Sequence, residues 1–380
     1  MTALRRDLHR MPEVSGKEMA TAARIAGWLE GCGADDVLTD LGGHGVACVF
    51  DSGQPGPTVL FRSELDGLPI HETGQPDWRS IIPGVGHMCG HDGHMVILCG
   101  LAKRMQERRP ARGRVVLLFQ PAEETGAGAR AVISDAQFER IRPDFAFGLH
   151  NLPGMPLGRA ATRDDSFCFA SEGMTIKLTG WTSHAAHPED GRSPADAMVD
   201  LVMKLPRLPK HLGFAAGEAL VTLSHVQMGE AAFGISPGEA RIMATIRART
   251  DDMQAALMDA ARKQANEVAE EAGLQVGIET AERFMACYND RAATAILRDA
   301  MGATGVESAE LGGPFRWSED FGVFSSVAPS AFFVLGAGKD HPQLHNPDYD
   351  FPDEIIPTGL AIFEAIARAQ CGALESSGGA

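Results

Sequence analysis

The middle of the chain, residues 172–284, carries a complete order of strands and helices of its own, and this constrains the fold more than any other feature. Apolar residues recur there with strand and helix periods in the order β-α-β-β-α-β, over 174–179, 194–205, 219–226, 240–248, 252–272 and 275–282. This is the ferredoxin-like order, which closes on itself. We therefore predict an inserted domain over 172–284, and a second, discontinuous domain built from 1–171 and 285–380.

The two flanking segments are typical of a sheet with helices packed against it. Short apolar runs predict strands, and longer periodic stretches predict helices between them. The predicted strands are 46–50, 58–62, 114–119, 144–149 and 330–335, and the predicted helices are 16–32, 91–108, 292–301 and 357–369. Because strands that alternate with helices are typical of α/β domains, we predict a mixed, mostly parallel sheet flanked by helices, with an α+β insertion. Only the tail at 375–380 is predicted to be disordered.

The composition excludes several classes of function. The net charge is −16 and the only dense basic stretch, 103–114, is interpreted as a solvated helix end, so we expect no nucleic-acid partner. No run of about 18 apolar residues occurs, and the N-terminal segment does not fit a secretory signal, so we expect no membrane association. Seven cysteines are scattered singly, which favours a reducing compartment, the cytoplasm, over a disulfide framework.

Three histidines, a cysteine and an aspartate fall within eight residues, from His87 to His94. A thiolate at Cys89 and an imidazole at His91 can reach one metal ion, and a thiolate can also bridge two. The alternative is a small buried residue surrounded by turn histidines, which is the usual interpretation of a lone cysteine. The density of metal-binding side chains in this glycine-rich stretch favours a metal site.

Two adjacent carboxylates, Glu123 and Glu124, follow the predicted strand 114–119 and a proline. Adjacent side chains on extended backbone point opposite ways, so we predict that one holds a metal ion while the other faces the substrate as a general base. Exposed glutamate pairs are common, but this pair follows a strand that is predicted to be buried.

Two further histidines complete the candidate set. His150 follows the predicted strand 144–149, and His345 lies in a proline-bearing loop near the end of the chain. A lone histidine in a loop is more often structural than a ligand. However, ligands gather at the carboxyl ends of strands in open α/β sheets, which favours one shared site.

Together these motifs resemble the M20 metallopeptidase family, and specifically its amidohydrolase branch of hippurate hydrolases and auxin-conjugate hydrolases. The resemblance covers nearly the whole chain, in motifs at 5–13, 60–70, 89–94, 119–124, 184–188, 318–321 and 345–347. It implies a catalytic domain with two divalent metal ions (zinc, manganese or cobalt) and an inserted lid through which the protein forms a homodimer. The implied activity is hydrolysis of the amide bond of N-acyl amino acids or similar conjugates, which releases a carboxylic acid and an amino acid.

The resemblance also implies roles for individual residues. The implied metal ligands are Cys89, which bridges the two ions, with His91, Glu124, His150 and His345. Glu123 is implied as the general base that deprotonates water and then protonates the leaving amine, and His184 as a stabiliser of the oxyanion. Arg247, in the lid, is implied to hold the substrate carboxylate, although lid arginines also serve structural ion pairs. Glu319 is a predicted pocket or supporting residue.

Three positions depart from the family pattern. Glu64 replaces an aspartate, and its longer side chain could change how the metal ligands are held in place by neighbouring groups. In the lid, Glu189 replaces a histidine and Gly234 replaces an asparagine, which bears on the acyl and amine preference. Two alternatives stay open: a dipeptidase or carboxypeptidase with the same dinuclear site, and an inactive metal-bound homodimer that only binds a ligand.

Overall fold

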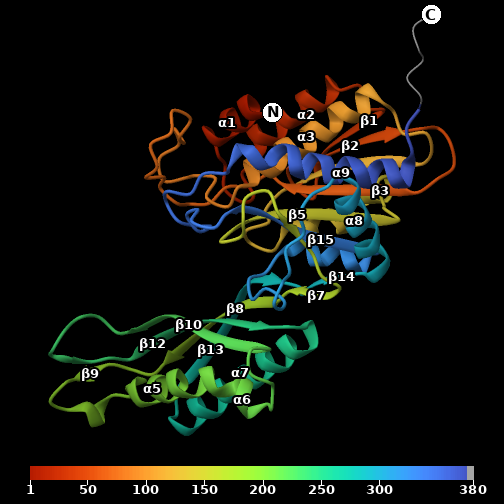
Figure 1. Cartoon of the computed structure of the whole chain (residues 1–380). Helices are drawn as coiled ribbons and strands as arrows, with labels where there is room; N and C mark the ends of the chain where they lie inside the picture. Colours follow the sequence, from red (N-terminus) through yellow and green to blue (C-terminus); the bar gives the residue numbers. More distant parts are fainter. Residues whose placement is uncertain (375–380) are drawn as a thin grey trace, which may run out of the picture. The chain divides into compact units, whose positions relative to one another are not determined.

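The computed structural model describes residues 1–374, and the predicted disordered tail lies outside them. The chain divides into two compact units (Figure 1). Unit 1 comprises Met1–Phe167, Cys287–Gly313 and Asp320–Ala380, and unit 2 comprises Cys168–Ala286 and Pro314–Glu319. The segment 314–319 was expected in the discontinuous domain but belongs to unit 2. There, the Phe169 N–H donates to the carbonyl oxygens of Phe315 and Trp317 at 3.0 and 3.2 Å.

Unit 1 is built on a seven-stranded sheet in the order β1-β2-β4-β3-β5-β15-β6. Its strands are β1 (Asp36–Leu41), β2 (Gly45–Asp51), β3 (Thr58–Glu64), β4 (Arg114–Gln120), β5 (Phe145–Pro153), β6 (Ala160–Ala161) and β15 (Ser330–Gly338). The neighbouring strands β4, β3, β5 and β15 run parallel, and antiparallel strands flank them on both sides. This confirms the predicted mixed sheet. A separate two-stranded sheet pairs β7 (Asp165–Cys168) with β14 (Cys287–Asn289).

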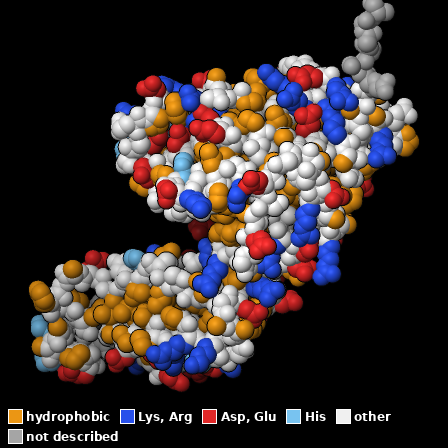
Figure 2. Space-filling model, in the orientation of Figure 1, with side chains coloured by type: hydrophobic (Ala, Val, Ile, Leu, Met, Phe, Trp, Pro, Cys, Tyr) orange, Lys and Arg blue, Asp and Glu red, His pale blue; other side chains and the backbone are white. Residues whose placement is uncertain are grey.

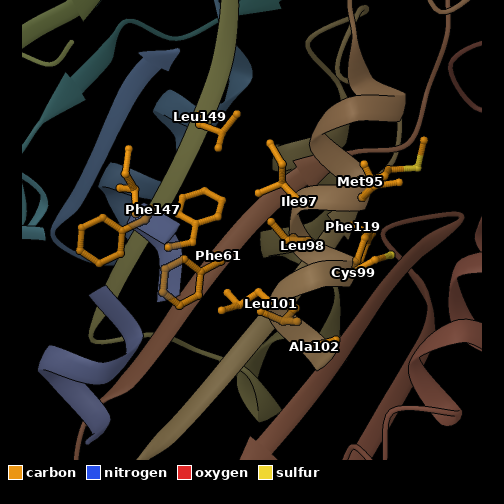
Figure 3. Close-up of a cluster of buried hydrophobic side chains, with 14 of the residues drawn as sticks. Phe61, Met95, Ile97, Leu98, Cys99, Leu101, Ala102, Phe119, Phe147 and Leu149 are labelled. Carbon is orange, nitrogen blue, oxygen red and sulfur yellow. The ribbon is translucent and has the colours of Figure 1, made fainter. Parts of the chain in front are cut away.

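Helices pack on this sheet and close its core. They are α1 (Thr2–His9), α2 (Met19–Glu30), α3 (His91–Glu107), α4 (Gly128–Ser134), α8 (Arg291–Ala303) and α9 (Ile356–Cys371). Side chains from α2, α3, α8 and α9 share one hydrophobic cluster with the strands. Every residue of α3 from His91 to Ala102 is buried, and Figure 3 shows its apolar side chains in the same cluster as Phe61, Phe119 and Phe147. Among the described residues, no helix is long and apolar enough to cross a bilayer.

Unit 2 has its own core and sheet. Its main elements are β8 (Ala170–Thr179), α5 (Ala195–Lys204), α6 (Leu208–His211), β10 (Ala219–Met228), β12 (Glu239–Ala248), α7 (Asp251–Glu271) and β13 (Gln275–Phe284). The strands form an antiparallel sheet in the order β10-β12-β8-β13, which confirms the ferredoxin-like fold of the insertion. A short ribbon pairs β9 (Ser183–His184) with β11 (Ile235–Ser236). Figure 2 shows hydrophobic side chains gathered on the visible face of unit 2.

The parallel strands of unit 1 place several candidate residues at one edge of the sheet. β3 ends at Glu64 and β4 at Gln120, and α3 begins at His91. Because parallel strands share one direction, their carboxyl ends meet at the same edge. His150 was expected after a strand but lies within β5, because the strand continues and His150 stands opposite Val334 of β15.

Candidate metal centre

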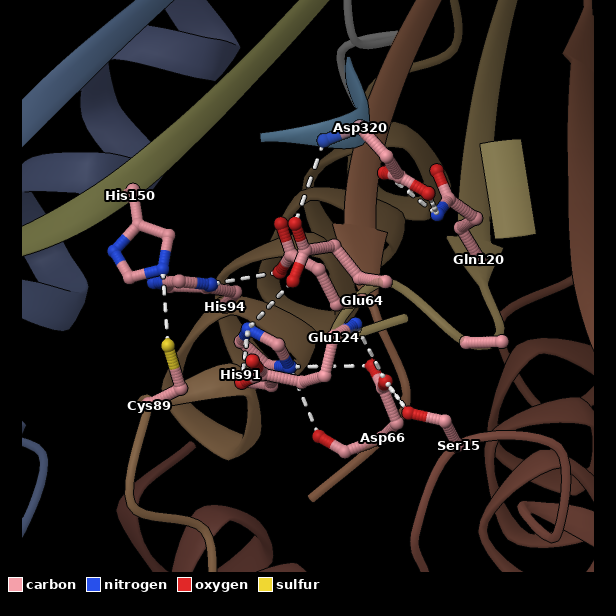
Figure 4. Close-up of polar contacts among 12 residues, drawn as sticks. Ser15, Glu64, Asp66, Cys89, His91, His94, Gln120, Glu124, His150 and Asp320 are labelled. Atoms are coloured by element: carbon pink, nitrogen blue, oxygen red, sulfur yellow. Dashed lines mark hydrogen bonds and ion pairs between the residues drawn. The ribbon is translucent and has the colours of Figure 1, made fainter. Parts of the chain in front are cut away.

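The five residues predicted as metal ligands come together in unit 1. Figure 4 shows four of them, Cys89, His91, Glu124 and His150. The ligand atoms of Cys89, His91 and His150 lie within 4.8 Å of one another, and so do those of Cys89, Glu124 and His345. Cys89 belongs to both groups, which is the position that a bridging thiolate would take. The geometry therefore offers two neighbouring sets of donors that share one sulfur.

Two of the histidines direct the same nitrogen to the centre. His91 Nδ1 donates to the carbonyl oxygen of Asp66 at 2.9 Å, and His150 Nδ1 donates to the carbonyl oxygen of Asn151 at 2.7 Å. In the neutral form of each ring, the lone pair is therefore on Nε2. His150 Nε2 is 3.4 Å from Cys89 Sγ. His91 Nε2 is buried and has no hydrogen-bond partner in the described part of the chain, as expected of a nitrogen placed to bind a cation.

The two adjacent glutamates lie in a turn between β4 and α4. The prediction that they stand on extended backbone and point in opposite directions is therefore wrong. Both carboxylates approach His91 Nε2, at 3.9 Å for Glu123 Oε2 and 3.8 Å for Glu124 Oε1. They differ in their other neighbours. Glu124 Oε2 is 3.6 Å from His345 Nε2, whereas Glu123 Oε1 accepts from the Asp320 N–H at 3.4 Å.

His94 belongs to the same motif, but its hydrogen bonds give it a supporting role. Its Nδ1 donates to Glu64 Oε2 at 2.7 Å, and its Nε2 accepts from the backbone and side-chain N–H groups of Asn151 at 3.2 and 3.1 Å. The Asn151 amide also donates to the Cys89 carbonyl oxygen at 2.8 Å, and the Tyr349 hydroxyl donates to Asn151 Oδ1 at 2.5 Å. Because both of its ring nitrogens make hydrogen bonds, His94 orients the backbone around the ligands and does not offer a lone pair to a metal ion.

Glu64, the departure from the family pattern, is accommodated by ionic contacts. Its buried carboxylate pairs with Arg62, and Arg62 also pairs with Asp320 at 2.5 Å. Burial alone would raise the pKa of Glu64, but Arg62 and His94 outweigh it and hold that pKa well below its ordinary value. The longer side chain thus stays ionised and holds His94 in place.

The electrostatics of the centre fit a divalent cation. Burial, together with Glu124 and Glu123, raises the pKa of the Cys89 thiol well above its ordinary value. Burial opposes charge on His91, but its hydrogen bond to Asp66 and the nearby carboxylates outweigh it and raise its pKa to about 10. A bound cation reverses both effects, because it stabilises a thiolate and a neutral imidazole. Sulfur, nitrogen and oxygen donors together suit zinc, manganese or cobalt.

A glycine between the candidate ligands Cys89 and His91 allows neighbouring side chains to pack closely against the backbone there. Gly90 has a φ of 89°, and a Cβ at this position would lie 2.5 Å from Asn151 Nδ2 and 2.8 Å from the Tyr349 hydroxyl. A side chain would therefore clash with the network that supports Cys89 and His91, and the left-handed backbone also favours glycine.

Two of the predicted residues lie on strands of unit 2. His184 is exposed on β9, and its Nδ1 accepts from the Ala186 N–H at 3.0 Å, so its proton is on Nε2. Arg247 on β12 donates from Nη1 to Ser318 Oγ at 2.8 Å and to the Arg316 carbonyl oxygen at 3.2 Å. Both acceptors are neutral groups, so these contacts are hydrogen bonds within unit 2 and not the structural ion pair that the sequence left open as an alternative.

Glu319, the last predicted site residue, ends the segment 314–319 and is 1% exposed. Sequence reasoning missed the roles of Asp66, Asn151 and Tyr349 in supporting the centre. The available signals were weak: Asp66 falls in the same motif as Glu64, Asn151 follows a candidate ligand, and Tyr349 is one of two tyrosines in the chain.

An α/β sheet with this set of donors at its carboxyl edge defines a class, the metal-dependent hydrolases. Within that class, the chain belongs to peptidase family M20/M25/M40, whose sequence model matches residues 60–369. This confirms the family resemblance found in the motifs.

Relatives match over nearly the whole chain. IAA-amino acid hydrolase ILR1-like 2 of Arabidopsis thaliana is 31% identical over 378 residues, which cover 97% of this chain and 84% of that protein. N-acetyldiaminopimelate deacetylase of Streptococcus suis is 31% identical over 363 residues, which cover 94% of this chain and 95% of that protein. Among solved structures, the YXEP protein of Bacillus subtilis, a dinuclear metal binding peptidase from the M20 family, has a TM-score of 0.80 at 25% identity and matches 96% of each chain.

Proposed function

We propose that this protein uses two divalent cations to hydrolyse the amide bond of N-acyl amino acids or similar amide conjugates. The observation that carries the proposal is the convergence, beside Glu123, of five donor side chains: Cys89, His91, Glu124, His150 and His345. The names of two relatives, an IAA-amino acid hydrolase and an N-acetyldiaminopimelate deacetylase, support the same substrate class.

Glu123 is the proposed general base. When bound, the cations supply Lewis-acid polarisation of the amide carbonyl and lower the pKa of water. Glu123 Oε2 faces the centre, while the Asp320 N–H holds its Oε1, so the carboxylate is oriented to take a proton from the attacking water. The same carboxyl then gives that proton to the leaving amine, which is a poor leaving group unless it is protonated.

Residues of unit 2 are proposed to recognise the substrate. His184 donates its Nε2–H to the developing oxyanion, because its Nδ1 is already an acceptor for Ala186. Arg247 binds the substrate carboxylate, with its guanidinium oriented by the bond to Ser318. Glu319 is proposed as a buried pocket residue.

We further propose zinc, manganese or cobalt as the cations, a homodimer formed through unit 2, and a cytoplasmic location. β10 is an edge strand of the unit 2 sheet with Val226 and Met228 exposed, and such an edge can pair with its copy. All seven cysteines are free and buried, which suits a reducing compartment.

The test is a substrate panel on protein that has been stripped by a chelator and reloaded with each metal ion. Release of free amine from hippurate, N-acetyl amino acids and dipeptides is measured. We expect stripping to abolish hydrolysis and one ion to restore it, with N-acyl substrates preferred. Hydrolysis of dipeptides alone would replace the proposal with a peptidase, and metal binding without any hydrolysis would replace it with a ligand-binding protein.

A matched pair of cysteine variants locates the activity. Cys89→Ser removes the shared sulfur and should abolish dinuclear loading and hydrolysis together. Cys371→Ala removes another buried free thiol, at the end of α9, and should leave both unchanged. Full activity in Cys89→Ser would place the site elsewhere.

A further inference from the structure

The turn that carries both candidate glutamates has a backbone conformation that needs support. Ala122, directly before Glu123, has a φ of 51°, in the left-handed region that a residue with a Cβ rarely adopts. Such a conformation persists only where the surroundings fix it, and it is found most often at functional sites. The direction in which Glu123 and Glu124 leave the turn depends on Ala122 keeping this conformation.

One side chain from a distant segment holds this residue. Glu18 Oε1 accepts from the Ala122 N–H at 2.8 Å and from the Gly16 N–H at 2.8 Å. Glu18 is fully buried, and burial raises its pKa above the ordinary value. A buried carboxylate is unfavourable unless its hydrogen bonds offset the lost hydration. The hydrogen bonds of Glu18 Oε1 go to the turn and to the loop that carries Glu18.

Helix capping does not explain Glu18. It is the N-cap residue of α2, yet its side chain makes no capping bond. Glu13 serves the first turn of that helix instead, because its Oε2 accepts from the Thr21 N–H at 2.7 Å and its Oε1 from the Ala20 N–H at 3.3 Å. The Glu18 carboxylate is therefore available to the glutamate turn.

The same loop also reaches the other side of the turn. Asp66 Oδ2 accepts from the Glu124 N–H at 3.0 Å and from the Ser15 hydroxyl at 2.7 Å, as Figure 4 shows. The loop at 15–18 thus holds the turn on both sides, directly through Glu18 and indirectly through the contact between Ser15 and Asp66. Because Asp66 also accepts from His91, the turn and a candidate ligand are oriented by one set of contacts.

We propose that Glu18 is a positioning residue that fixes the Ala122 backbone and thereby orients Glu123 for proton transfer and Glu124 for binding the cation. This inference rests on the proposed hydrolytic function. Glu18 acts through the two hydrogen bonds that it accepts, so the position requires an oxygen acceptor and not a negative charge. Substrate binding, which involves other residues, does not depend on it.

The test compares Glu18→Ala with Glu18→Gln, whose amide oxygen can accept the same two bonds. For Glu18→Ala we expect kcat to fall about 10- to 100-fold with KM within twofold, and for Glu18→Gln we expect kcat within about fivefold of the wild type. Equal losses in both variants, or full kcat in Glu18→Ala, would overturn the proposal. Glu13→Ala is the control: it removes a helix cap of the same segment and should lower the melting temperature without lowering kcat.

Binding of Co²⁺ to the metal-free protein provides a readout that needs no turnover. Thiolate-to-metal absorption reports loading, and Glu18→Ala should require about tenfold more Co²⁺ than Glu18→Gln or Glu13→Ala. If the wild type hydrolyses no amide of the panel, the proposed function fails, while the Co²⁺ titration still tests the positioning role. If Glu18→Ala does not fold, Glu18→Asp, which is one methylene shorter, takes its place with the same expected order of effects.

Discussion

The centre in unit 1 and the β9–β11 ribbon in unit 2 hold their chemically active side chains in different ways. His91, His150 and Glu123 are 0%, 6% and 5% exposed, and each histidine ring is oriented through its Nδ1. His184 is exposed on a two-residue strand, and its Nδ1 bond goes to a backbone group two residues away. The fold therefore buries most of the centre, in which His345 is the exposed candidate ligand, whereas the ribbon carries His184 at the surface of unit 2.

This difference predicts which measurements will respond to a substitution. A buried group that shares hydrogen bonds with its neighbours affects stability, cation binding and turnover together. An exposed group affects turnover alone, because the folded unit does not depend on it. The following variants test that separation, from the largest expected effect to the smallest.

The base itself should show the largest effect. Glu123→Gln keeps the size of the side chain but removes the proton acceptor, so we expect kcat to fall about 1000-fold or more. The metal content should stay at two ions per chain, measured by elemental analysis after gel filtration. Glu124→Gln is the matched control, and it should lose metal as well as activity. An active Glu123→Gln enzyme would show that another group is the base.

The ribbon should affect turnover without affecting the fold. His184→Ala removes the proposed oxyanion donor, and we expect kcat to fall about 100-fold. The melting temperature and metal content should match those of the wild type. His187→Ala, a change at an exposed histidine of the same segment, should leave all three quantities unchanged. A large fall in melting temperature for His184→Ala would erase the contrast between the two regions.

The supporting histidine should affect cation binding and stability together. His94→Ala removes one hydrogen-bond partner from Glu64 and one from Asn151, so we expect the affinity for Zn²⁺ to fall about 10- to 100-fold, with a lower melting temperature. Competition with a chromogenic chelator measures the affinity. His71→Ala, at an exposed position of the same unit, is the control. Unchanged affinity in His94→Ala would mean that the network around Cys89 does not orient the ligands.

A pH effect on stability should be the smallest. Burial opposes charge on His9, but Asp92 and Glu72 outweigh it and raise its pKa to about 10, against about 6.5 in an unfolded chain. Because the folded-state pKa is the higher one, charged His9 stabilises unit 1 fully below pH ~6.5, and this stabilisation is lost as the pH rises towards 10.

Urea unfolding of the wild type and His9→Gln at several pH values measures this effect. The difference in unfolding free energy should be larger at pH 6.5 than at pH 10, by at most about 4 kcal/mol, which is the linkage value for a pKa that moves from about 6.5 to about 10 on folding. His225→Gln, at an exposed histidine of unit 2, should show no such trend. A difference that grows with pH would contradict the assigned ion pair.

Most of the fold was accessible from local patterns. Strands β2, β3 and β4 are short apolar runs because nearly all of their side chains are buried. The ferredoxin-like order of unit 2 could also be predicted without any long-range information. The edge strand β1 was missed because only Leu38 and Leu41 are buried along it. α2 starts later than predicted because Gly16 takes a left-handed φ of 75°.

The candidate site was predictable only where residue type itself suggests chemistry. Cys89, His91 and the glutamates stand out in the sequence, but the groups that orient them do not. Tyr349 and Asn151 are 198 positions apart, and no local pattern encodes such a pair. The turn at Glu123 was mispredicted because its conformation is set by a contact between Ala122 and Glu18, 104 positions away.

The burial of α3 has a thermodynamic consequence for the proposed metal protein. Its first residue is the candidate ligand His91, and the following three turns are enclosed by the core on all sides. Loss of the metal ion would remove a bond that holds the first residue of α3, the helix around which unit 1 is packed. The free energy of unfolding should therefore rise with the concentration of free zinc, by about 2.7 kcal/mol when the ion is a hundredfold above its dissociation constant. At low zinc the enzyme would unfold more often and be degraded by proteases.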